Sequence, residues 1–228
     1  MVSVIAVDGP AGSGKSSVSR GVATELGYRY LDTGAMYRAM TWACLQAGIP
    51  VDDPDAVAAF AETPVIVSGT DPRAPSITVD GVDVATPIRS PEVTGAVSPV
   101  SAVPAVRARL VEAQRHAVAQ ALQDGMGIVV EGRDIGAVVL PDADLKVFLI
   151  ADPAVRAQRR AAQDAGGEAV DARSVQQTEA SLIARDAYDA GRAASPMTQA
   201  ADAVVIDTSP LTLDEVVQAI CARAREGR

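Results

Sequence analysis

Eight consecutive residues near the beginning of the chain, 9–16, have the types and the spacing that bind phosphate. Their sequence, Gly-Pro-Ala-Gly-Ser-Gly-Lys-Ser, fits the phosphate-binding loop pattern G-x-x-x-x-G-K-S/T. The glycines let the backbone wrap around an anion, so that backbone N–H groups point at it. Lys15 adds a point charge for the β- and γ-phosphates, and the Ser16 hydroxyl can bind Mg²⁺. The loop therefore predicts a nucleoside triphosphate site formed by Gly9, Pro10, Ala11, Gly12, Ser13, Gly14, Lys15 and Ser16.

The elements on either side of the loop are those that the pattern requires. Residues 2–7 form a short apolar run, which is typical of a buried parallel strand. After the loop, Val18, Val22 and Leu26 recur at helical spacing until Gly27 provides a C-terminal stop. Because strand, loop and helix follow one another in this order, a chance match to the pattern is the weaker explanation.

The rest of the chain alternates predicted strands with predicted helices. The further strands are expected at residues 28–31, 128–130, 145–150 and 203–206. Five strands that alternate with helices predict an α/β protein with a doubly wound parallel sheet in a three-layer P-loop fold. A long helix is expected to begin at Ser101, with Pro104 in its first turn, and to run to Gly125.

One segment interrupts this alternation. Residues 65–67 and 77–79 have strand-like composition, and Asp80-Gly81 is a hairpin signal. We therefore expect a small antiparallel unit, inserted into the parallel fold and lying on top of the main sheet.

Composition limits the classes of partner. The net charge of −9 argues against a broad nucleic-acid surface and against binding to an anionic membrane. Cys44 and Cys221 lie within apolar helical patterns and are expected to be buried, reduced thiols. The only histidine, His116, falls within a predicted helix and is expected at its surface rather than in catalysis. No apolar run reaches membrane-spanning length, and no basic leader precedes the first strand, so we expect a cytoplasmic protein.

Nearly all cations are arginines, whose planar guanidinium groups bind phosphate with two hydrogen bonds. Two charged sets lie on predicted helices: Arg156, Arg159 and Arg160, and Arg185, Asp189 and Arg192. By spacing alone, each set fits a solvated helix face or a salt-bridge ladder as well as a ligand site. Arg133 and Asp134 directly follow a buried strand, at the edge where open parallel sheets bind ligands, which favours a functional role.

Five segments together resemble the bacterial cytidylate kinase family over essentially the full length. They are IAVDGPAGSGK at 5–15, LDTGAMYR at 31–38, VEGRDIG at 130–136, PDA at 141–143 and ADA at 201–203. The resemblance implies Mg²⁺-dependent transfer of the ATP γ-phosphate to CMP or dCMP, which gives ADP and CDP or dCDP without a general base. It implies one domain, 1–228, with a core at 1–60, 94–152 and 200–228, a monophosphate-binding insertion at 61–93 and a helical lid with the following helices at 153–199.

The resemblance also implies which residues bind the acceptor. The CMP phosphate would be held by Arg38, Arg133 and Arg192, and the ribose by Arg185 and Asp189. The cytosine edge would be read by Ser98, Arg107 and Asp134. Thr33 and Tyr37 lie in a matching segment and are expected to bind the same substrate. A carboxylate at Asp134 would accept from the cytosine amino group and reject uracil, which lacks this donor.

On the donor side, the resemblance places Arg156, Arg159 and Arg160 in the lid over the ATP phosphates. Lys15, Arg156 and Arg160 would neutralise charge on the transferred group, and Arg159 would bind ATP. The family often has glycine after the loop lysine, so Ser16 and Ser17 are alternative ligands for Mg²⁺. The expected protein is a monomer without a nucleic acid polymer or membrane partner. Alternatives are a kinase for UMP, AMP or shikimate, and a nucleotide-binding switch protein.

Overall fold

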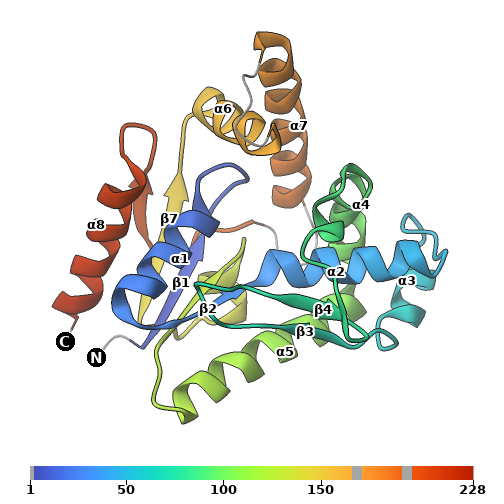
Figure 1. Cartoon of the computed structure of the whole chain (residues 1–228), viewed down its shortest axis with the longest axis horizontal. Coiled ribbons are helices and arrows are strands. Elements are labelled where there is room, and N and C mark those ends of the chain that lie inside the picture. Colours follow the sequence, from blue (N-terminus) through green and yellow to red (C-terminus); the bar gives the residue numbers. More distant parts are fainter. Residues whose placement is uncertain (1–2, 166–170, 192–196, 228) are drawn as a thin grey trace.

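The computed structural model describes residues 3–165, 171–191 and 197–227 (Figure 1). Its centre is a parallel sheet of five strands in the order β2-β6-β1-β7-β8. The strands are β1 (Val4–Asp8), β2 (Arg29–Asp32), β6 (Ile128–Glu131), β7 (Leu145–Ile150) and β8 (Val204–Asp207). Because all neighbouring pairs are parallel, their carboxyl ends share one edge of the sheet. The predicted fold class is confirmed.

Helices cover both faces of this sheet, because the apolar side chains of the central strand β1 point alternately to one face and to the other. One face packs against α1 (Lys15–Leu26) and α8 (Leu213–Glu226), and includes Ile5 and Val7. The other packs against α2 (Thr33–Gln46) and α5 (Pro104–Gln123), and includes Val4 and Ala6. Successive side chains of a strand point to opposite faces, so all five residues of β1 are buried.

The predicted insertion is a small antiparallel sheet that packs against α2 (Figure 1). It consists of β3 (Ile66–Ser68), β4 (Ile77–Val79) and β5 (Val82–Asp83), and follows α3 (Pro54–Phe60). Asp80 and Gly81 have φ angles of 51° and 80°, which a tight hairpin turn requires at both central positions. The loop between β3 and β4 reaches the main sheet, where the Tyr30 N–H donates to the Thr70 carbonyl.

The predicted helix start at Ser101 is wrong. Ser101 lies in the last turn of α4 (Pro91–Ala102), which follows the short turn η1 (Pro87–Arg89), and its hydroxyl donates to the Ser98 carbonyl. Ser90 caps α4 by accepting from Val93 N–H, and α5 begins after Val103. Proline at the first position of both helices needs no N–H partner. Pro104 was expected in the first turn of the long helix, whereas the helix that begins at Pro91 was not predicted.

Two further helices, α6 (Pro153–Asp164) and α7 (Ala172–Ala190), pack together above the carboxyl edge of the sheet (Figure 1). A π-helical turn, η2 (Ile135–Val139), follows β6. Cys44 and Cys221 are buried, and burial raises the pKa of the Cys44 thiol to about 11. His116 is exposed on α5.

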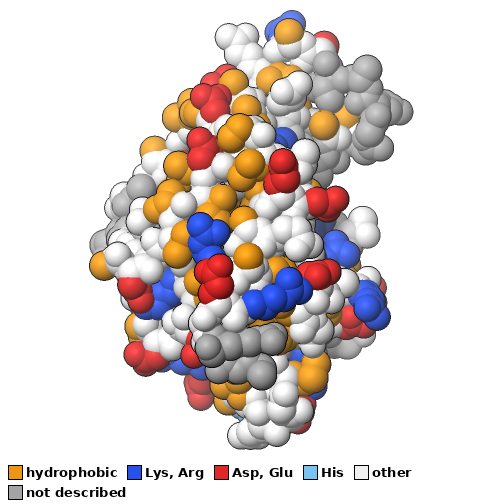
Figure 2. Space-filling model, turned by 90° about the vertical axis from the view of Figure 1, so that its left-hand side faces the viewer, with side chains coloured by type: hydrophobic (Ala, Val, Ile, Leu, Met, Phe, Trp, Pro, Cys, Tyr) orange, Lys and Arg blue, Asp and Glu red, His pale blue; other side chains and the backbone are white. Residues whose placement is uncertain are grey.

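On the face that carries α8, acidic and basic side chains are interspersed rather than gathered by sign (Figure 2). None of the described helices combines the length and the apolar character that crossing a membrane would need.

Candidate active site

The phosphate-binding loop requires glycine at two close approaches. Gly9 has φ 145°, and a Cβ there would overlap the Leu149 carbonyl oxygen of β7. Gly12 has φ 77°, and a Cβ there would lie 2.9 Å from the Arg156 carbonyl oxygen of α6. The loop therefore fits tightly between β7 and α6. Lys15 begins α1, and its Nζ donates to the Pro10 carbonyl at 2.7 Å, across the loop.

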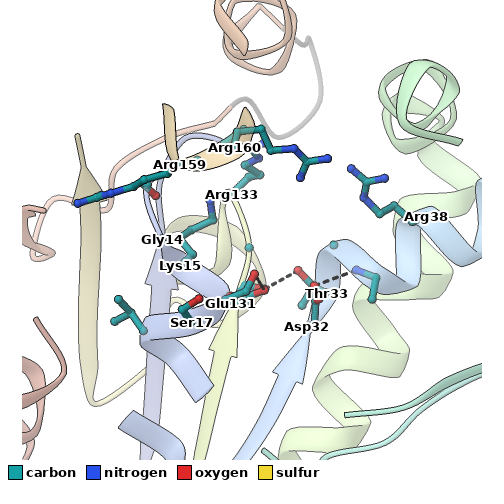
Figure 3. Close-up of a pocket in the computed structure, with 18 of the residues that line it drawn as sticks. Gly14, Lys15, Ser17, Asp32, Thr33, Arg38, Glu131, Arg133, Arg159 and Arg160 are labelled. Carbon is teal, nitrogen blue, oxygen red and sulfur yellow. Dashed lines mark hydrogen bonds between the residues drawn. The ribbon is translucent and has the colours of Figure 1, made fainter. Parts of the chain in front are cut away.

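A pocket of about 530 Å³ opens beside this loop (Figure 3). Its walls come from the loop and α1, the ends of β2 and β6, the helices α2, α4, α5 and α6, the turn η1, and the segment after β8 together with the start of α8. The predicted residues that line it are Ala11, Gly12, Ser13, Gly14, Lys15, Ser16, Ser17, Thr33, Tyr37, Arg38, Arg107, Arg133, Asp134, Arg159 and Arg160. One continuous pocket thus joins both halves of the predicted site.

Two carboxylates lie at the strand ends below the loop. Glu131 ends β6 and accepts from the Ser16 hydroxyl at 2.7 Å, and Asp32 ends β2 (Figure 3). Burial and the nearby charge of Asp32 raise the pKa of Glu131, while Lys15 lowers it. Thr33 donates its hydroxyl to the Glu131 carbonyl at 2.7 Å and so joins the two strand ends. The result is a cluster of oxygen atoms directly beside Lys15.

At the other end of the pocket, Arg107 and Asp134 form a buried ion pair. Nη2 of Arg107 lies 2.5 Å from Oδ2 of Asp134, and their side chains are 9% and 8% exposed. The Arg107 guanidinium also lies over the Tyr37 ring, 5.7 Å from its centre. The pair presents hydrogen-bond donors and acceptors side by side in a nearly dry environment.

Arg38 and the α4 helix form the rim at this end. Arg38 donates from Nη1 to the Ile88 carbonyl at 3.0 Å and to the Thr94 hydroxyl at 2.9 Å. Ser98, predicted to read the base, is not among the lining residues, whereas Ser101 is. Both are in the last two turns of α4, and a role for Ser98 stays a prediction.

The predicted lid arginines point in three different directions. Arg160 extends towards Arg38 across the pocket, whereas Arg159 points the opposite way (Figure 3). Arg159 donates to the Thr208 hydroxyl at 2.9 Å and to the Thr208 carbonyl at 2.7 Å. Arg156 is buried, is not among the lining residues, and donates to the Ala11 carbonyl at 3.1 Å. Of these three arginines, only Arg160 therefore extends into the space between the phosphate-binding loop and Arg38.

Asp186 of α7 connects α6 and α7 to the phosphate-binding loop. Its carboxylate pairs with Arg156 and accepts from the Ala11 N–H at 3.3 Å. It also lies 3.6 Å from Nη1 of Arg133, which in turn donates to the Gly9 carbonyl at 3.1 Å. One carboxylate thus contacts the loop, α6 and the end of β6.

Three predicted residues cannot be placed in the pocket. Arg192 lies outside the described residues, and Arg185 and Asp189 lie on α7 with side chains outside what the structure describes. Residues that were not predicted but contact the site are Asp8, Asp32, Glu131, Asp186 and Thr208. Asp8, Asp32 and Glu131 each end a buried strand, which is the signal that could have revealed them.

Comparison with known proteins identifies the family. A family model described as cytidylate kinase matches residues 5–226. The chain belongs to the cytidylate kinase family. A cytidylate kinase of Streptomyces avermitilis is 53% identical over 99% of this chain and 94% of its own length. Cytidylate kinases of Streptomyces coelicolor (55% identical, 99% and 94% covered) and Nocardia farcinica (53% identical, 94% and 90% covered) are similar to it as well.

Membership of the cytidylate kinase family confirms the resemblance drawn from the five sequence segments. It makes the chain a kinase, and the alternative of a nucleotide-binding switch protein is not favoured. The family match does not say what each residue of the pocket does, so these roles are inferred from the chemistry of the contacts that each residue makes.

Proposed function

We propose that this pocket transfers the γ-phosphate of ATP to CMP or dCMP and releases ADP and CDP or dCDP. The observation that carries the proposal is the buried Arg107–Asp134 pair, which lies in the same pocket as the phosphate-binding loop. A nucleotide switch needs only the loop. A second polar, desolvated end with its own arginines is what a phosphate acceptor requires.

The acceptor end suits cytosine. The Asp134 carboxylate can accept from the exocyclic amino group, and Arg107 can donate to the ring carbonyl and nitrogen. Uracil presents an acceptor where cytosine has this amino group, so it would leave Asp134 facing a second acceptor. Arg38 and Arg133 line the same pocket and offer guanidinium groups that would bind the CMP phosphate. Ser98, Arg185, Asp189 and Arg192 remain proposed partners of the same nucleotide.

The donor end suits ATP. The loop N–H groups and Lys15 would bind its phosphates, because the N-terminus of α1 concentrates positive partial charge there. Leu211, Leu213 and Val216 line the pocket and offer an apolar surface for the adenine ring. Leu211 is close to the side chain of Arg159, because its N–H donates to the Thr208 carbonyl and Arg159 binds Thr208 as well. Lys15 would exchange the Pro10 carbonyl for a phosphate oxygen when the nucleotide binds.

The residues beside Lys15 fit a magnesium ion. Ser16, Asp32 and Glu131 supply oxygen atoms, the ligands that Mg²⁺ prefers. Among the described residues, no three carboxylate, histidine or cysteine side chains form a metal site by themselves, which fits an ion that shares its ligands with substrate phosphates. The hydrogen bond between Ser16 and Glu131 favours Ser16 over Ser17 as the hydroxyl ligand. When bound, the ion would neutralise charge on the phosphates.

Catalysis by these residues would consist of positioning and charge neutralisation. Arg160 extends over the gap between the two ends, where charge shifts during transfer. Arg133 is held by the Gly9 carbonyl, so it can bind the acceptor phosphate close to the loop. Helices α6 and α7 lie above the carboxyl edge of the sheet, and α6 contributes lining residues to the pocket. These helices would exclude water, which otherwise competes as an acceptor. No general base is required.

The test is a panel of acceptors. ADP release from ATP is measured with CMP, dCMP, UMP, AMP and shikimate, and the Lys15→Ala protein serves as the blank for contaminating kinases. We expect turnover with CMP or dCMP to exceed that with the other acceptors. ATP binding without turnover stimulated by any acceptor would contradict the proposal and favour a switch protein. Sedimentation of the same sample tests the inference of a monomer.

We also infer a cytoplasmic enzyme without a nucleic acid polymer or membrane as partner. The net charge of −9 supports this, because a polyanion would be repelled. On the face shown in Figure 2, acidic and basic side chains are interspersed, so this face offers no continuous basic surface for a polyanion.

A further inference from the structure

Asp8 is a buried carboxylate for which the proposed transfer reaction has no direct use. It ends β1, immediately before the phosphate-binding loop, and is 4% exposed. Its Oδ1 accepts from the Ile135 N–H and its Oδ2 from the Gly136 N–H, each at 2.8 Å. These two N–H groups open the π-helical turn η2. Asp8 therefore ties the end of the central strand to the turn that follows Asp134.

Asp134 is held on both sides by this arrangement. Before it, the Gly132 N–H donates to the Val7 carbonyl at 3.0 Å, which fixes the end of β6 to β1. After it, Asp8 holds the next two residues, and the Asp134 carbonyl accepts from the Val138 and Val139 N–H groups at 2.8 and 3.2 Å. The direction of the Asp134 side chain towards Arg107 thus depends on a turn that Asp8 caps.

The position of Asp8 is costly for the fold. Burial and the charge of Asp134 raise the pKa of Asp8 to about 6, whereas the two N–H bonds and Lys15 lower it. Two carboxylates that interact in a buried place repel each other. Burial of the Asp8 carboxylate therefore lowers the stability of the fold near neutral pH. Its two hydrogen bonds to η2 indicate that it shapes this turn.

We propose that Asp8 is a positioning residue for base recognition, and that it acts by holding the turn that orients Asp134. Both oxygens are needed, because each satisfies one of two consecutive N–H groups. The inference rests on the proposed function, since it concerns the choice between cytosine and uracil. Asp8 itself touches neither base in this role.

The experiment compares kcat/KM for CMP and for UMP in the wild type and in Asp8→Ala and Asp8→Asn. Asp8→Ala leaves two buried N–H groups without an acceptor, and we expect the CMP-to-UMP ratio to fall about tenfold or more. Asp8→Asn keeps one acceptor oxygen and should give an intermediate ratio. A merely structural role would lower Tm and leave the ratio unchanged.

Asp144 provides a matched control at the opposite end of β1. Its Oδ2 accepts from the Ser3 and Val4 N–H groups at 2.8 and 2.9 Å, far from the pocket. Asp144→Ala removes the same number of strand-end hydrogen bonds, although from an exposed carboxylate. We expect it to lower Tm somewhat and to keep the wild-type CMP-to-UMP ratio.

A double variant identifies the route of the effect. If Asp8 acts through Asp134, adding Asp8→Ala to Asp134→Ala causes no further loss of discrimination. A wild-type ratio in Asp8→Ala, with CMP turnover intact in the wild type, overturns the inference alone. Absence of CMP turnover in the wild type overturns the proposed function instead. If Asp8→Ala does not fold, the ratio in Asp8→Asn decides the question, because this variant keeps the shape of the side chain.

Discussion

Lys15 is the one cation that the loop places next to the oxygen cluster of Ser16 and Glu131. Its Nζ donates to the Pro10 carbonyl, a bond that a phosphate oxygen can replace. We expect Lys15→Ala to lower kcat by about a hundredfold or more, because a charge placed for the transition state is lost. Tm should change little, since the loop keeps its glycines. Near-normal turnover in a folded variant would refute the role of Lys15.

In the proposed reaction Asp134 would carry the discrimination between bases, and in the structure it neutralises a buried arginine. Asp134→Ala should lower the CMP-to-UMP ratio of kcat/KM about tenfold or more, because the acceptor for the amino group is lost. It should also destabilise the protein by about 3 kcal/mol, because Arg107 is left buried without its partner. Steady-state kinetics and urea unfolding measure the two effects.

The exposed pair of Arg29 and Asp124 is the control, with side chains 31% and 39% exposed. Asp124→Ala should change neither the ratio nor, measurably, the free energy of unfolding, because water screens such a pair. An Asp134→Ala protein that keeps its CMP preference would rule out Asp134 as the reader of the base.

At the scale of elements, the sequence was informative where structure depends on neighbouring residues. The strand, loop and helix around Gly9 follow from local apolar patterns and glycines, and the hairpin at Asp80 follows from its turn residues. The α4 helix was not predicted, because Pro99 and small residues obscure its periodicity. The η2 turn depends on Asp8, which is 127 positions away from Ile135, so no local pattern could indicate it.

The contacts of α6 and α7 with the loop are a second feature that depends on the tertiary structure and could not be predicted from local sequence patterns. Asp186 acquires its role only because α7 folds back onto Ala11 and Arg156. Its spacing from the predicted arginines of α7 carried no such signal. Likewise, Arg156 and Arg159 were grouped with Arg160 by proximity in sequence, whereas only helix docking decides which guanidinium faces the pocket.

The same contacts predict what holds α7 against the phosphate-binding loop. Asp186→Asn removes the charge that pairs with Arg156 and weakens the bond to the Ala11 N–H. We expect faster hydrogen exchange in α7 of the nucleotide-free protein, because the helix is held less firmly to the loop. Glu179→Gln, on the same helix about two turns earlier, removes one charge and is the matched control. Equal hydrogen exchange in both variants would show that Asp186 does not hold α7 against the loop.

At the scale of the whole molecule, buried carboxylates make stability depend on pH. The pKa of Asp8 rises from 3.8 to about 6 on folding, so the folded state binds more protons than the unfolded state between these values. The stabilisation is therefore complete below the unfolded pKa and is lost as pH rises through the folded pKa. Glu131 also makes the stability of the fold decrease as pH rises, because its pKa is raised as well.

Comparison with Asp8→Asn isolates the contribution of one group, because Glu131 and the net charge elsewhere are common to both proteins. We expect the free energy of unfolding of the wild type, relative to this variant, to fall by about 2 kcal/mol between about pH 4 and about pH 7. Urea unfolding at a series of pH values measures the difference. Parallel curves would mean that Asp8 keeps an ordinary pKa in the folded protein. If the difference in the free energy of unfolding falls as pH rises, the charged Asp8 carboxylate beside the turn η2 lowers the stability of the fold near neutral pH.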